Sequence, residues 1–144
     1  MREENIKINI QEELKRAEEA LISADLLFEN KLLKDAISRL YYFALYNVRA
    51  LLLTKGIEPR SHEGALRLLS LHFVKEGILK SQIAHIFSRL MKYREEADYN
   101  PSYIFTNDDF IAFRDETKEL AGAIRDYLRA QGYLSDERPQ EEEE

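Results

Sequence analysis

Apolar residues recur along the chain at intervals of three and four, the spacing that gathers side chains on one face of an α-helix. No stretch alternates apolar and polar residues as a half-buried strand does. The pattern therefore predicts an all-α protein, an up-and-down helical bundle of about five helices. The predicted helices cover residues 8–29, 32–54, from Ser61 to before Gly77, from there to about 96, and from Thr106 to before Gly132.

Residues that start or stop helices fall between these runs. Asn30 is a candidate C-terminal stop for the first helix, and Pro59 marks a loop because proline disfavours helix in the residue before it. Ser61 is a candidate N-cap. Thr106, with Asp109 three residues later, resembles a capping box. These signals support the boundaries that the apolar pattern predicts.

Composition limits the class of protein. The chain has 144 residues, of which 44% are hydrophobic, enough for one domain with a core. We expect that domain to cover residues 1–134, with an acidic, flexible tail over 135–144 that ends in four glutamates. The absence of cysteine excludes disulfides and thiolate metal sites.

Neither a membrane partner nor a secreted location is expected. No run reaches the roughly 20 apolar residues of a membrane span, and the first residues, Met-Arg-Glu-Glu, do not form a signal peptide. We therefore predict a cytoplasmic protein.

The formal charge of −6 is unevenly distributed. Residues 31–94 hold 12 Lys and Arg against 4 Asp and Glu, whereas residues 95–144 hold 5 against 15. A basic segment inside an acidic protein is compatible with nucleotide or RNA contact. The alternative is that neighbouring acidic helices neutralise it.

The helix over residues 32–54 carries an unusual polar face. Arg39, Tyr42, Tyr46 and Arg49 gather there, at offsets that make helical neighbours. Aromatic rings with guanidinium groups suit stacking, phosphate contact or burial against a partner, so a ligand site and an interface both remain open. The opposite face is a predicted core stripe of Ile37, Leu40, Ala44, Val48 and Leu51.

The histidines are scattered, at positions 62, 72 and 85. His62 would lie at a helix N-terminus, where it could donate to a phosphate or simply pack against the loop. Arg67 and His72 are five residues apart and would lie on different sides of a helix, which favours a structural role. The pattern predicts no metal site and no cofactor.

Three short signatures follow one another in register. They are residues 38–42 (Ser-Arg-Leu-Tyr-Tyr), 61–64 (Ser-His-Glu-Gly) and 94–99 (Arg-Glu-Glu-Ala-Asp-Tyr). With the helical layout, they resemble the HEPN family (higher eukaryotes and prokaryotes nucleotide-binding domain) over roughly residues 10–130. The resemblance is greatest to the small prokaryotic branch encoded beside minimal nucleotidyltransferases.

The resemblance implies a bundle, often homodimeric, that binds nucleotides or RNA, and many such proteins are toxins or partners of a minimal nucleotidyltransferase. Catalytic relatives are metal-independent ribonucleases with an Arg followed, after four to six residues, by a His. Here the positions that follow Arg94 at that spacing are Tyr99, Asn100 and Pro101, with no histidine. The resemblance also implies that a tyrosine near this position can be the target of nucleotide transfer. In this sequence Tyr99 and Tyr103 are available for that role.

We therefore predict a HEPN-like protein that binds a nucleotide or RNA and acts with a minimal nucleotidyltransferase, as a toxin–antitoxin pair and as a homodimer. Asp98 should pair with Arg94, four residues before it. The alternatives are a metal-independent ribonuclease with a non-standard active site and a pure protein-interaction module. Candidate catalytic residues are Arg94, Tyr99, His72 and His62, and candidate binding residues are Arg39, Tyr42, Tyr46, Arg49, His62, Arg94, Asp98 and Tyr99.

Overall fold

The computed structural model describes residues 3–135, and within that range it contains helices and no strand. The all-α prediction is therefore confirmed. The predicted acidic tail lies, beyond Ser135, outside the described residues. The α-helices are α1 (Glu3–Glu29), α2 (Leu33–Leu53), α3 (His62–Leu69), α4 (Ser81–Tyr99) and α5 (Asn107–Ala130).

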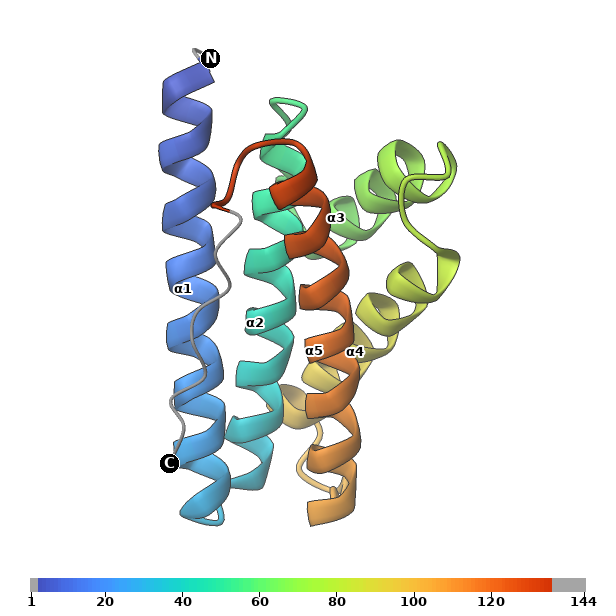
Figure 1. The fold of residues 1–144 in the computed structure, drawn as a ribbon. Helices are drawn as coiled ribbons and strands as arrows, with labels where there is room; N and C mark the ends of the chain where they lie inside the picture. Colours follow the sequence, from blue (N-terminus) through green and yellow to red (C-terminus); the bar gives the residue numbers. More distant parts are fainter. Residues whose placement is uncertain (1–2, 136–144) are drawn as a thin grey trace.

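The long helices α1, α2, α4 and α5 alternate in direction, and α3 crosses at one side of this bundle (Figure 1). The helix α2 is central, because it packs against each of the other four. Fourteen of its 21 residues are buried, so its sides face protein almost all round. All five residues of the predicted core stripe are among them, namely Ile37, Leu40, Ala44, Val48 and Leu51.

The caps that the sequence predicts are present. The amide of Gly64 donates to the Ser61 hydroxyl at 2.9 Å. A Cβ atom at position 64 would lie only 2.9 Å from that hydroxyl oxygen, which explains why glycine suits this capped turn. Thr106 and Asp109 form the expected capping box at the start of α5. At the end of α1 the left-handed residue is Lys31 (φ 63°), one position after Asn30.

The predicted third helix is α-helical only over its first part, and this expectation is corrected. The α-helix ends at Leu69 and is followed by a π-helical turn over Ser70–Val74. The Lys55 ammonium donates to the His72 carbonyl at 2.8 Å and lies 4.8 Å from the centre of the Phe73 ring. These contacts hold the wider turn against the end of α2, an interaction that apolar spacing alone does not reveal.

Candidate functional site

A single charged side chain, Arg94, is buried in the part of the chain that the structure describes. It lies on α4, with 8% of its surface exposed. A buried guanidinium needs polar partners, since burial removes its hydration. The predicted ion pair is present, because Arg94 Nη1 lies 3.3 Å from Asp98 Oδ2. Arg94 Nε, however, is buried without a hydrogen-bond partner, so the guanidinium is only partly satisfied.

Aromatic rings surround this arginine. Its guanidinium carbon lies 5.3 Å from the centre of the Tyr41 ring and 6.0 Å from that of Tyr99, distances at which a cation is attracted to a ring face. Tyr41 is fully buried on α2 and stacks on Phe87 of α4. Tyr99 is 76% exposed. The arginine is therefore close to one buried ring and one exposed ring.

Tyr41 also connects Arg94 to a histidine. The Tyr41 hydroxyl lies 2.6 Å from Nδ1 of His62, the first residue of α3. Sequence reasoning missed Tyr41, although it lies within the signature over residues 38–42. The available signal was a hydroxyl-bearing ring at a core position, because a buried tyrosine usually needs a hydrogen-bond partner.

Tyr42 and Arg39 complete the cluster. The Tyr42 ring lies 6.2 Å from the His62 ring, and the Arg39 guanidinium lies 4.5 Å from the centre of the Tyr42 ring. Folding thus brings together groups from α2, α3 and α4 that are far apart in the sequence. We call this cluster the Arg94 centre; it consists of Arg39, Tyr41, Tyr42, His62, Arg94, Asp98 and Tyr99.

The other two residues of the predicted α2 face, Tyr46 and Arg49, contact side chains of α1. The Tyr46 ring lies 4.3 Å from the Arg16 guanidinium. Arg49 Nε lies 3.4 Å from Glu13 Oε1, so an acid from α1 partly neutralises a face that carries none of its own. Arg49 nevertheless shares a cavity of about 190 Å³ with His62 and Arg60, which keeps it at the edge of the Arg94 centre.

His72, a second candidate, lies elsewhere. It belongs to the π-helical turn, where its carbonyl accepts from Lys55 and its side chain lies near Glu76. Within residues 3–135 no hydrogen bond, ion pair or ring contact joins it to the Arg94 centre. The fold therefore does not bring His72 to the Arg94 centre, and its candidate role remains a prediction.

The protonation states of the site follow from burial and from Arg94. Burial lowers the pKa of His62, and the positive charges of Arg94 and Arg49 lower it further, against an opposing effect of Glu95. Burial raises the pKa of Tyr41 well above its ordinary value, although Arg94 opposes this. At neutral pH the centre therefore combines a neutral tyrosine–histidine pair with a charged arginine.

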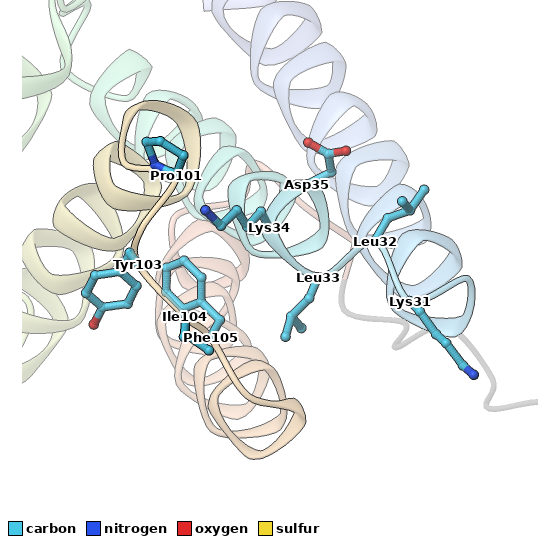
Figure 2. Close-up of a pocket in the computed structure, with 9 residues that line it drawn as sticks. All are labelled: Lys31, Leu32, Leu33, Lys34, Asp35, Pro101, Tyr103, Ile104 and Phe105. Atoms are coloured by element: carbon cyan, nitrogen blue, oxygen red, sulfur yellow. The ribbon is translucent and has the colours of Figure 1, made fainter.

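Another cavity lies away from the Arg94 centre. It measures about 450 Å³ and lies between the α1–α2 turn and the segment that joins α4 to α5 (Figure 2). Tyr103 lines it, but no member of the Arg94 centre does. Its Lys34 ammonium already donates to the Asn100 carbonyl at 2.9 Å. This cavity is therefore separate from the Arg94 centre.

Within residues 3–135 no helix has the length and apolar character that spanning a membrane requires. No three His, Cys, Asp or Glu side chains in that range are placed to hold a metal ion.

The fold and the Arg94 centre define the class: an all-α bundle that holds charged and aromatic side chains where three helices meet. The chain matches the HEPN domain over residues 10–129 and belongs to the HEPN domain family. It is similar to "Putative toxin MJ0605" of Methanocaldococcus jannaschii, with 40% identity over 95 residues, 66% of this chain and 71% of the relative.

Two other relatives show the same likeness. A "UPF0332 protein" of Thermotoga maritima is 32% identical over 121 residues, which cover 83% of this chain and 81% of that protein. "Putative toxin MJ0142" of Methanocaldococcus jannaschii is 33% identical over 94 residues, 65% of this chain and 64% of the relative.

The lowered pKa of His62 predicts a pH-dependent stability. Below about pH 6.5 the unfolded chain binds a proton that folded His62 resists, so the free energy of unfolding should fall as pH drops from about 7 to about 5. The variant His62→Gln, which cannot titrate, should show a smaller fall in urea unfolding. His85→Gln, at an exposed position of α4, is the control. Equal slopes in wild type and His62→Gln would contradict the assignment.

Proposed function

We propose that this protein binds RNA or a nucleotide through the Arg94 centre and acts with a separately encoded minimal nucleotidyltransferase, as the toxin of a toxin–antitoxin pair in the cytoplasm. The observation that carries the binding proposal is the incomplete satisfaction of Arg94, whose buried Nε has no partner. A buried cation that is not fully hydrogen-bonded is costly to maintain for stability alone. A phosphate at the small exposed part of the guanidinium would add a charge-assisted bond to the one with Asp98.

The surroundings of Arg94 suit a nucleotide in particular. The exposed Tyr99 ring next to Arg94 offers a face on which a base can stack. Arg39 and Tyr42 present a second arginine–aromatic pair beside His62. Phosphate contact and base stacking together are the usual means of binding single-stranded nucleic acid.

The basic segment is only partly neutralised, which also supports the proposal. Arg49, Lys55 and Arg89 pair with Glu13, Glu76 and Glu116. Arg39 and Arg60, which lie beside His62 or Tyr42, form no ion pair within the described residues. Within the described chain, two positive charges without an ion pair therefore lie at or beside the Arg94 centre.

The proposed partners are supported less directly. Two relatives carry the word toxin in their names, which supports the toxin role. The pairing with a nucleotidyltransferase rests on the resemblance carried by the three signatures. Tyr99, exposed beside Arg94, and Tyr103, at the larger cavity, are the proposed targets of a transferred nucleotide. We also propose a homodimer, in which a symmetric interface would let two copies border one cleft.

A metal-independent ribonuclease is the second candidate function. The observation that favours it is that folding brings His62 to the Arg94 centre through Tyr41, although the chain has no histidine at the usual spacing after Arg94. A histidine and an arginine at one phosphate would allow proton transfer and charge stabilisation.

The binding proposal predicts a selective loss in Arg94 variants. Arg94→Ala should lower the affinity for a short single-stranded RNA of mixed sequence by about tenfold or more, since a charge-assisted bond contributes about 1.5–3 kcal/mol. Arg89→Ala is the matched control, because Arg89 lies on the same helix in an exposed ion pair with Glu116. Fluorescence anisotropy measures both affinities.

Because Arg94 is buried, its truncation could also unfold the chain. Thermal melting followed by circular dichroism identifies that case, and Arg39→Ala, at a half-buried position, then provides the second test. Folded Arg94→Ala and Arg39→Ala proteins that bind RNA as tightly as Arg89→Ala would disprove binding at the Arg94 centre.

The two candidate functions, RNA binding and metal-independent ribonuclease activity, differ in whether the protein cleaves RNA. If the protein only binds, labelled RNA incubated with it in EDTA should stay intact. Cleavage that disappears in Arg94→Ala, but persists in Arg89→Ala, would instead establish a metal-independent ribonuclease at the Arg94 centre.

A further inference from the structure

The hydrogen bond between Tyr41 and His62 has a direction that the surrounding atoms determine. A neutral imidazole carries one proton, so one ring nitrogen donates and the other accepts. Tyr41 is fully buried, and among residues 3–135 its hydroxyl has no hydrogen-bond partner besides His62 Nδ1. If Nδ1 carried the proton, the tyrosine proton would be left without an acceptor, which is costly in the interior.

The nearby charges oppose the remaining possibility, an imidazolium with protons on both nitrogens. A protonated Nδ1 would face the Tyr41 hydroxyl, and the positive charge would lie near Arg94. Among the described residues, the negative charge of Glu95 acts in the other direction. The groups that face His62 are Tyr41, Tyr42 and Arg49 of α2, Arg60 of the preceding loop, and Arg94 and Glu95 of α4.

From this geometry we infer that Tyr41 is a positioning residue that keeps Nδ1 of His62 as the acceptor and Nε2 as the donor. His62 then presents an N–H group, and no basic nitrogen, to a phosphate oxygen at the Arg94 centre. Within the described chain nothing hydrogen-bonds to Nε2, and this atom is not among the buried unsatisfied groups. It is therefore available to a ligand.

The cavity beside His62 fits an anionic oxygen. It has a volume of about 190 Å³ and is lined by Arg49 and Arg60 as well as His62. A donor N–H that shares a cavity with two arginines can bind a phosphate without a proton transfer. This part of the inference rests on the proposed function, whereas the tautomer itself does not. It also separates the two candidate functions, because a His62 held in this way cannot serve as a general base.

The tautomer is read from the free, full-length protein by NMR of the imidazole nitrogens, with His62 assigned by its absence in His62→Gln. At neutral pH, Nε2 should be protonated and Nδ1 unprotonated. Tyr41→Phe, which keeps the buried ring and removes only the hydroxyl, should give a mixture of both tautomers. A protonated Nδ1 in the wild type, or an unchanged tautomer in folded Tyr41→Phe, would overturn the inference.

The role toward phosphate is tested with short single-stranded RNA and two substitutions. The side-chain nitrogen of Gln occupies the place of Nε2 and that of Asn the place of Nδ1. Both variants should bind more weakly than the wild type, but His62→Gln should bind about tenfold more tightly than His62→Asn. Adding RNA to the wild type should shift the Nε2 resonance.

The outcomes distinguish this inference from the proposed function. If RNA binds but leaves Nε2 unchanged, or if His62→Gln and His62→Asn bind equally, His62 does not donate to the ligand, while binding by the Arg94 centre stands. If RNA does not bind at all, the proposed function fails, and only the tautomer found in the free protein supports or refutes the role of Tyr41.

Discussion

Burial of a positive charge at Arg94 is the constraint on which the arrangement of the site depends. Removing a guanidinium from water is costly, and its ion pair with Asp98 satisfies one side of it. The Tyr41 and Tyr99 rings offer it the negative faces of their π systems. These interactions leave Nε without an acceptor. The folded protein therefore holds the arginine in position, but not all of its hydrogen-bond donors have a partner among the described residues.

The central helix α2 links this constraint to the fold. It packs against all four other helices, and the same helix carries Tyr41, Tyr42 and Arg39. Because Tyr41 is part of the core, its hydroxyl is held rigidly at 2.6 Å from His62. The capped turn at Ser61, for which glycine at position 64 leaves room, fixes the start of α3 and therefore His62. The stability of the bundle thus sets the geometry of the site.

Local signals in the sequence predicted much of the fold. The apolar spacing gave the helices, and Ser61 and Thr106 act as the caps that their positions indicate. The ion pair of Arg94 with Asp98 was also predictable, because both residues lie on one helix at a spacing of four. The contact between Tyr41 and His62 was not, since it joins positions 21 apart through the packing of two helices. The π-helical turn and the pairing of Arg49 with Glu13 likewise depend on tertiary contacts.

The central claim is that the Arg94 centre binds the phosphate groups of RNA. The most direct test is the affinity of the wild-type protein for short single-stranded RNA as a function of salt concentration. Phosphate binding releases counterions, so the logarithm of the association constant should fall linearly and steeply with the logarithm of salt, with a slope of about −0.7 for each phosphate neutralised. An affinity that barely changes with salt would contradict the claim and indicate instead a surface that docks another protein through its aromatic rings.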